Sequence, residues 1–130
     1  MSRRETYHLD PVKHNAPIPM GAKVGNVVFS SAIGGANPAT GVVPEGIDEQ
    51  CENAFQNLRN FLAKAGATTD DVVRISVFMK SEANRQKINK PWLEMFPDEQ
   101  DRPARHQLVV ENMPLPYDVQ IEAIAVLPTA

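Results

Sequence analysis

Apolar and polar residues alternate with a period of two along several stretches of the chain, a pattern typical of strands with one buried face. The clearest stretch is residues 119–126, where Val119, Ile121, Ala123 and Ala125 fall on one face. The same alternation predicts five further strands, at residues 6–9, 22–24, 27–31, 72–79 and 104–110. Gly and Asn between the second and third of these favour a tight hairpin turn.

The alternation predicts apolar residues on both faces of the sheet. Within residues 72–79 one face is assigned to Val73, Ile75, Val77 and Met79. The second face of the sheet is expected to carry Phe78, Val109, Ile124 and Val126. Because that face is too apolar to meet water alone, we expect other subunits to cover it in a closed ring.

Two segments show helical spacing instead. In residues 47–65 an apolar stripe is formed by Ile47, Cys51, Ala54, Phe55, Leu58, Phe61, Leu62 and Ala65. Polar residues, Gln50 and Asn57 among them, are expected on the other side, and Gly66 is a suitable C-terminal cap. Residues 83–96 form a second predicted helix, which Pro91 divides by a kink or into two short pieces.

The elements follow the order β-β-β-α-β-α-β-β, with a loop at residues 32–46. Two amphipathic helices and one sheet predict an α+β two-layer sandwich with both helices on one face. A chain of 130 residues suits a single domain spanning residues 1–130.

Composition narrows the class of protein. The net charge of -3 and the lack of a basic run argue against a nucleic-acid partner. No apolar run approaches the ~18 residues that cross a membrane, and no signal peptide is apparent. Cys51 is the single cysteine, lies on the apolar stripe, and suits a reducing compartment, so we expect a cytoplasmic protein. The histidines show no metal-ligand spacing.

The candidate chemistry centres on Arg105, near the start of an apolar strand. A guanidinium is costly to bury without a partner, so Arg105 either forms an ion pair inside the protein or binds an anion. Gln120 and Glu122 share one face of the last strand, where they are either site residues or a hydrogen-bonded pair at an interface.

Several blocks of sequence, taken in order, resemble the RidA (YjgF-type) family of imine deaminases. They include Gly25-Asn26-Val27-Val28-Phe29-Ser30-Ser31, Asn37-Pro38-Ala39-Thr40-Gly41, residues 71–80, Arg102-Pro103-Ala104-Arg105 and residues 119–126. The resemblance implies a chorismate-mutase-like fold assembled as a homotrimer, with sites between subunits. It also implies hydrolysis of 2-imino acids to 2-oxo acids and ammonia, with no cofactor and no metal.

In this family Arg105 matches the arginine that binds the substrate carboxylate. The resemblance also places the backbone at Gln107 and the hydroxyl of Ser31, together with Ser30, around the ligand. Trp92 is either a packing residue or a wall of the cleft. A guanidinium suits this role because it binds a carboxylate through two parallel hydrogen bonds.

The sequence departs from the family pattern at several of these positions. Gln120 stands where the family has a glutamate that positions and activates water, and Glu122 lies two residues further on. Ile18 replaces a tyrosine of the early proline loop, and His106 replaces a small residue. A glutamine holds a water molecule but cannot take its proton.

The favoured function is therefore a RidA-like enamine/imine deaminase that hydrolyses small 2-imino acids, a hydrolase of C=N bonds. One alternative is a non-catalytic trimer that binds a small carboxylate as a sensor or scavenger, which Gln120 favours. Another is a deaminase of a different substrate, such as an aminomuconate-like acid. RNA cleavage, attached to some relatives, is disfavoured by the acidic composition.

Overall fold

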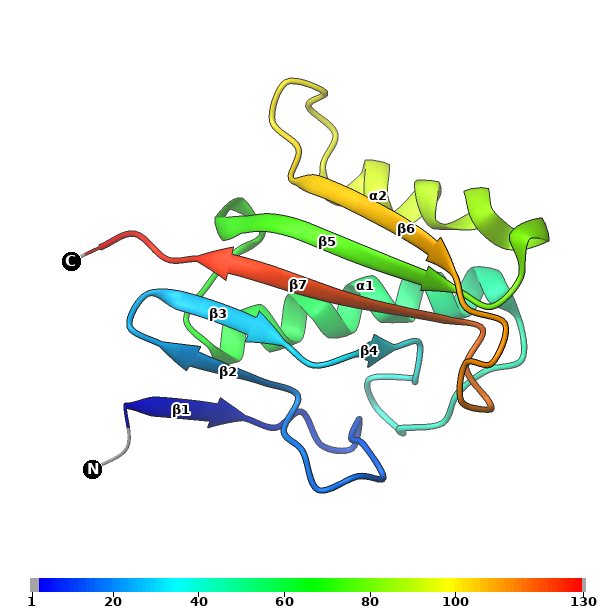
Figure 1. The fold of residues 1–130 in the computed structure, drawn as a ribbon, viewed down its shortest axis with the longest axis horizontal. Coiled ribbons are helices and arrows are strands. Elements are labelled where there is room, and N and C mark those ends of the chain that lie inside the picture. The colour runs from blue at the N-terminus through cyan, green and yellow to red at the C-terminus, as the bar shows by residue number, and fades with distance from the viewer. Residues whose placement is uncertain (1–2, 130) are drawn as a thin grey trace.

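The computed structural model describes residues 3–129, and its main elements follow the predicted order (Figure 1). The strands in these residues are β1 (Arg4–Tyr7), β2 (Gly21–Val24), β3 (Val27–Ser30), β4 (Ile33–Gly34), β5 (Val72–Met79), β6 (Ala104–Val109) and β7 (Val119–Val126). The helices are α1 (Ile47–Lys64) and α2 (Asn89–Met95), with 3₁₀ helices η1 (Thr69–Asp71) and η2 (Glu82–Ile88).

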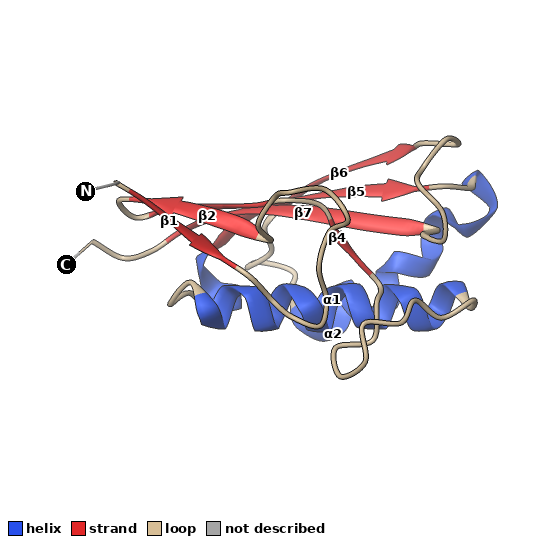
Figure 2. Cartoon of the chain, turned by 90° about the horizontal axis from the view of Figure 1, so that it is seen from below, coloured by secondary structure: helices blue, strands red, loops and turns tan. Residues whose placement is uncertain are grey.

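The strands form one mixed sheet in the order β1-β2-β3-β7-β5-β6, and β4 also pairs with β7. Only β5 and β6 run parallel among these pairs in residues 3–129. Both helices lie on one face of the sheet (Figure 2), which confirms the predicted α+β two-layer arrangement. β6 and β7 are consecutive in the chain but are not neighbours, because β5 lies between them.

The core is formed where α1 packs beneath the centre of the sheet. The alternation predicted for β7 is confirmed, since Val119, Ile121, Ala123 and Ala125 are all buried. Cys51, Ala54, Phe55, Leu58, Phe61 and Leu62 bury the predicted stripe of α1 against it. Gly66 follows the helix with a φ of 78°, as expected of a C-terminal cap.

Two predicted face assignments are wrong. A β-bulge between Val72 and Arg74 interrupts the alternation, so Val72 is buried and Val73 is 51% exposed. Val109 pairs with the buried Met79, so it lies on the face covered by helices rather than on the open face. Both assignments depend on strand pairing, since the bulge forms against β7 and the face of Val109 follows from its register with β5.

Strand boundaries also differ from the prediction at the N-terminal half. β1 begins and ends two residues before the predicted range of 6–9. The segment predicted as a loop at residues 32–46 contains the short strand β4, whose Ile33 and Gly34 pair with Ile121 and Gln120. A strand of two residues has too little alternation to be detected in a sequence.

The polar side of α1 was predicted to be exposed, yet Gln50 and Asn57 are fully buried. Gln50 accepts a hydrogen bond from the backbone N–H of Asp118 at 2.9 Å and donates to the carbonyl of Pro44 at 2.8 Å. These bonds fasten the loop before α1 to the start of β7. A helix face whose polar side chains bind buried backbone groups has the same composition as a face exposed to water. The sequence therefore does not distinguish the two.

Asn57 holds the backbone around β4 in the same way. Its Nδ2 donates to the carbonyls of Gly34 at 3.0 Å and Ala36 at 2.8 Å, and Asn53 donates to Gly35 at 3.1 Å. The spacing of these amides along α1 places them on one line facing the chain segment 34–36.

Close packing explains the glycine pair at positions 34 and 35. A Cβ at Gly34 would lie 2.2 Å from the ring of Tyr117, and one at Gly35 would lie 2.3 Å from the backbone of Gln50. Neither residue has a positive φ. The pair is therefore required by the close approach of β4 to α1 and to the loop before β7, not by an unusual backbone conformation.

The predicted second helix is divided into two pieces, η2 and α2, which meet at Ile88 and Asn89. Ser81 caps the first piece by accepting a hydrogen bond from the backbone N–H of Ala83. Pro91 lies in the first turn of α2, where its missing N–H removes no intrahelical bond.

The face of the sheet away from the helices exposes large apolar side chains. Phe29 is 55% exposed, and Val27, Leu108 and Val126 are each exposed by more than a third. Phe78 and Ile124 lie between them in the register of β5 and β7. The composition predicted for this open face is confirmed except for Val109.

Replacing Asn57 by alanine is expected to lower the free energy of unfolding by about 2–4 kcal/mol, because the carbonyls of Gly34 and Ala36 stay buried without their donor. Urea denaturation measures this loss. The control is Gln56→Ala, an exposed amide on the same helix, which should change the free energy by less than about 0.5 kcal/mol. Equal effects of the two substitutions would contradict the proposed anchoring role.

Candidate functional site

An open groove of about 480 Å³ lies at the β6 edge of the sheet, on the side of η2 and α2. We call it the Arg105 groove, and its lining residues are Arg85, Gln86, Asn89, Arg105, His106 and Gln107. β6 supplies three of these residues, η2 supplies two, and α2 supplies its first residue. The groove thus exists only because the two helical pieces pack beside the edge strand.

Arg105 is held in the groove by neutral groups. Its guanidinium carbon lies 4.9 Å from the centre of the Trp92 ring, and its Nη2 donates to Oδ1 of Asn89 at 2.9 Å. Trp92 is buried and packs edge-on against Phe96. Stacking on an aromatic ring fixes the plane of the guanidinium and leaves most of its N–H donors available.

Within residues 3–129, Arg105 forms no ion pair with a carboxylate. Partial desolvation and, to a smaller extent, the charge of Arg85 lower the pKa of Arg105 from its usual value. An arginine remains charged under such a shift. Of the two roles predicted for Arg105, the internal ion pair is therefore absent from these residues, and the groove holds a cation suited to an anion.

Gln107 fixes Arg85 beside Arg105. The Gln107 side-chain amide donates to the backbone carbonyl of Arg85, and Arg85 donates through Nη2 to the backbone carbonyl of Gln107 at 3.4 Å. This reciprocal contact fastens η2 to β6. In the single chain, the Gln107 carbonyl is therefore engaged by Arg85.

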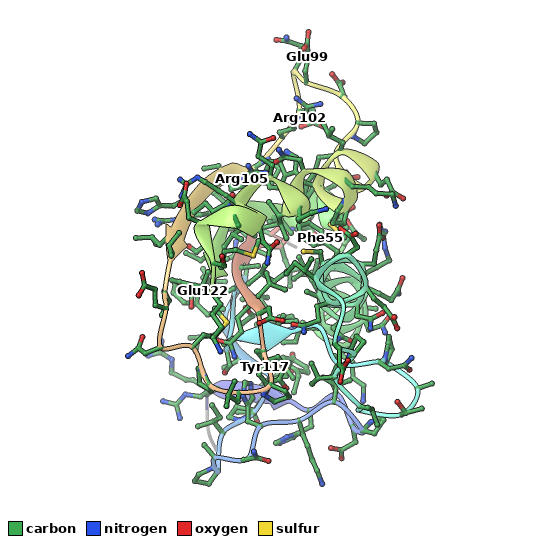
Figure 3. The ribbon with its side chains drawn as sticks, turned by 90° about the vertical axis from the view of Figure 1, so that its right-hand side faces the viewer. Phe55, Glu99, Arg102, Arg105, Tyr117 and Glu122 are labelled. Atoms are coloured by element: carbon green, nitrogen blue, oxygen red, sulfur yellow. The ribbon has the colours of Figure 1, made fainter. Side chains whose placement is uncertain are left out.

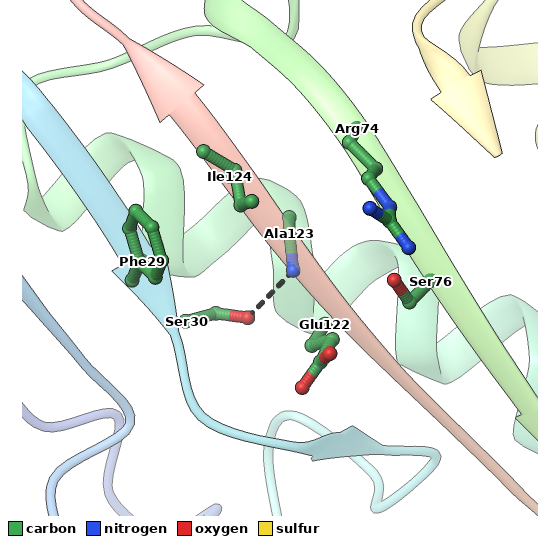
Figure 4. A pocket seen from close by; sticks show the side chains of 7 residues that line it. All are labelled: Phe29, Ser30, Arg74, Ser76, Glu122, Ala123 and Ile124. Atoms are coloured by element: carbon green, nitrogen blue, oxygen red, sulfur yellow. Dashed lines mark hydrogen bonds between the residues drawn. The ribbon is translucent and has the colours of Figure 1, made fainter. Parts of the chain in front are cut away.

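A second, smaller hollow of about 180 Å³ lies on the open face of the sheet (Figure 4). We call it the open-face hollow, and it is lined by Phe29, Ser30, Arg74, Ser76, Glu122, Ala123 and Ile124. The Ser30 hydroxyl accepts a hydrogen bond from the backbone N–H of Ala123 at 2.8 Å. Glu122 is exposed and pairs with Ser76 of β5, two residues from Arg74.

The predicted site residues are divided between the two faces of the sheet. Arg105 pairs with Ile75 on the helix side, whereas Glu122 pairs with Ser76 on the open side. Figure 3 shows the separation of Arg105 and Glu122. Gln120 also faces the open side, opposite Phe78. One chain therefore does not bring the arginine and the two polar residues of β7 together.

The remaining predicted residues lie outside both depressions. The Ser31 hydroxyl donates to the carbonyl of Pro19 at 2.9 Å, next to the loop that carries Ile18. Ile18 is 46% exposed. β7 and β5 separate β3, the strand that precedes Ser31, from β6.

His106 points to the open face, as predicted from its position next to Arg105. Its Nδ1 lies 3.4 Å from Nη2 of Arg74. Arg85 and Asn89 were not predicted as site residues. Their spacing of four residues along one helical face was the available signal, but which face meets β6 is decided only by the fold.

Residues 3–129 contain neither a candidate metal site nor a helix that could span a membrane. His, Cys, Asp and Glu side chains do not gather there in a group that could hold a metal ion. In the same residues neither helix is long and apolar enough to cross a membrane. Cys51 is completely buried, which confirms its predicted place in the core.

The fold and the groove define a class, a small α+β protein with an arginine-lined groove at the edge of a mixed sheet. The family profile described as "Endoribonuclease L-PSP" matches residues 13–127. The chain belongs to this family, which is the RidA family that the sequence resembles.

Relatives and solved structures agree with this membership. Escherichia coli 2-iminobutanoate/2-iminopropanoate deaminase is 30% identical over 111 residues, covering 85% of this chain and 87% of that protein. RidA from the Antarctic bacterium Psychrobacter sp. superposes with a TM-score of 0.85 at 25% identity, covering 94% of this chain and 98% of that one. Escherichia coli TdcF with bound serine gives 0.84 at 25% identity, with 95% and 98% covered.

Cys51 is expected to be unreactive in the folded protein. Burial, followed by the charges of Asp48 and Glu52, raises the pKa of its thiol to about 12. At pH 8 the thiolate is therefore scarce, and alkylation by iodoacetamide should be slower than in the denatured chain by a factor on the order of 10³. Mass spectrometry of labelled protein measures both rates. Equal rates in the folded and denatured states would contradict a core role.

Proposed function

We propose that this protein is a RidA-type deaminase that hydrolyses small 2-imino acids to 2-oxo acids and ammonia, with Arg105 binding the carboxylate. The observation that carries the proposal is the state of Arg105, a guanidinium stacked on Trp92 in an open groove and bonded to the neutral Asn89. The named deaminase activity of the Escherichia coli relative supports it. So does the serine bound to TdcF, since serine is a small amino acid.

Arg105 contributes to the reaction by orientation. Asn89 accepts a hydrogen bond from only one N–H of Arg105, at Nη2. The other N–H groups of Arg105 can therefore bind a carboxylate through two parallel hydrogen bonds. The carboxylate carbon of a 2-imino acid is bonded directly to the imine carbon. Binding the carboxylate therefore also positions the C=N bond. Water then adds to the C=N bond, its oxygen bonding to carbon and a proton passing to nitrogen. Cleavage of the C–N bond releases ammonia and leaves the 2-oxo acid.

Gln120 is proposed to position the attacking water. Its amide donates and accepts hydrogen bonds, so it can orient a water molecule, but it cannot accept the water's proton. A general base contributes about 10²–10⁴ in rate. We therefore propose that wild-type protein is slower than a deaminase with a glutamate there, and that Glu122, on the same face, is the carboxylate that remains near the reaction.

We further propose that the complete site forms between subunits of a homotrimer. Two observations support this assembly. Arg105 and Gln120 lie on opposite faces of the sheet in one chain, and the open face exposes Phe29, Val27 and Val126. A closed ring that buries the open faces removes an apolar patch from water. It also allows the open-face residues of one chain to approach a groove of its neighbour.

The second candidate function is non-catalytic binding of a small carboxylate, as a sensor or scavenger. Gln120 is the observation that favours it, because the amide lacks the proton-accepting group of a general base. The same groove and the same Arg105 would then serve binding alone.

The first test is a coupled assay in which threonine dehydratase generates 2-iminobutanoate and semicarbazide competes for it. Wild type is expected to hydrolyse the imine, and Arg105→Ala to lower kcat/KM at least about 100-fold through loss of two charge-assisted bonds. Gln120→Glu is expected to raise kcat by supplying a base. The control Arg59→Ala removes a cation from the exposed side of α1 and should match wild type.

Each result of this assay separates the two candidates. An inactive wild type whose activity appears in Gln120→Glu would support the binding function. Full activity in Arg105→Ala would contradict the carboxylate role of Arg105 in either function.

Light scattering is expected to give three times the mass of the chain. Phe29→Asp places a charge on the open face and should shift the protein to smaller species, because an unpaired charge is costly to bury at an interface. The control is Leu93→Asp, an exposed apolar residue of α2 on the helix side, which should leave the mass unchanged. A wild-type monomer would contradict the trimer and the site between subunits.

A further inference from the structure

From the Arg105 groove we infer that the preferred substrate carries a second acidic group, bound by Arg85, so that the protein acts on 2-imino dicarboxylates. This inference rests on the proposed function, because it assigns the first carboxylate to Arg105. It adds a specificity-determining residue that the sequence did not single out.

The charges of the groove carry the inference. Of the residues that line it, Arg85 and Arg105 carry guanidinium groups and Gln86, Asn89 and Gln107 carry uncharged amides, while the side chain of His106 points to the open face. No carboxylate belongs to the lining within residues 3–129. Arg85 is close enough to lower the pKa of Arg105 by repulsion. An anion with one charge leaves the two guanidinium groups with a net charge of +1, whereas an anion with two charges neutralises both.

The position of Arg85 is fixed rather than incidental. Gln107 binds the backbone of Arg85, and Arg85 binds the backbone of Gln107, so η2 with Arg85 is fastened to β6 with Arg105. Arg85 also meets Glu82 at 3.4 Å in an exposed i, i+3 pair. Such surface pairs contribute little, so a substrate carboxylate can replace Glu82 at Nη1 and accept a charge-assisted hydrogen bond there.

The size of the groove fits the same class of substrate. Its 480 Å³ lies within the range of small-molecule sites, whereas an imino acid of three or four carbons fills only part of it. A longer acid can keep its 2-imino carboxylate at Arg105 and extend its second carboxylate along η2 toward Arg85.

Lys87 provides a matched control. It lies two residues from Arg85 on η2 and carries the same charge, but it pairs with Asp48 of α1 at 3.7 Å and does not line the groove. Removing either residue changes the net charge equally. Only the loss of Arg85 removes a donor from the groove.

The test is a fluorescence titration of Trp92, the single tryptophan, whose ring stacks on Arg105. The probes are stable 2-oxo acids, 2-oxobutanoate with one carboxylate and 2-oxoglutarate with two. Wild type is expected to bind 2-oxoglutarate about tenfold to a hundredfold more tightly. Arg85→Gln should bring the two dissociation constants within about twofold of each other. Lys87→Gln should keep the wild-type preference.

Three outcomes overturn the inference: equal binding of both probes by wild type, a preference that survives Arg85→Gln, or a preference that Lys87→Gln removes equally. The last would show general attraction between charges. If 2-iminobutanoate is hydrolysed and the preference is absent, this inference alone fails. If wild type hydrolyses no imine but keeps an Arg85-dependent preference, the deaminase function fails and the dicarboxylate site stands.

Discussion

The structure depends on amide side chains of α1 that bind the backbone of the loop preceding the helix. Asn57 and Asn53 donate to the carbonyls of residues 34–36, and Gln50 donates to the carbonyl of Pro44. This contact places β4 alongside β7, and it brings Gly34 opposite Gln120. The backbone that lies opposite Gln120 is thus held from the helix side of the sheet.

The arrangement gives the sheet two chemically different sides. On the helix side, the edge strand β6 meets η2 and α2 to form a charged groove. On the open side, apolar residues surround a hollow that contains Ser30 and Glu122. Because side chains of successive strand residues point to opposite faces, the Arg-His-Gln run of β6 contributes to both sides at once.

Apolar periodicity in the sequence predicted the elements whose position depends on neighbouring residues alone. The bounds of β5 and β7 and the start of α1 were correct because alternation and helical spacing run there without interruption. The bulge at Val73, the face of Val109 and the burial of Asn57 were missed because each depends on a partner distant in sequence. Arg105 was found as a charge on an apolar strand. Arg85 was missed because an exposed helical arginine looks ordinary until its neighbour is known.

The contact between Arg85 and Gln107 also covers part of the exposed edge of the sheet. β6 is the outermost strand, and an outer strand presents backbone groups to which a strand of another molecule can add. Arg85 donates a hydrogen bond to one of these groups, the carbonyl of Gln107. Pro103, which has no N–H, lies immediately before the strand. The groups that build the groove thereby also guard the sheet against edge-to-edge aggregation. A substitution of Arg85 or Gln107 would therefore alter the groove and expose the edge strand at the same time.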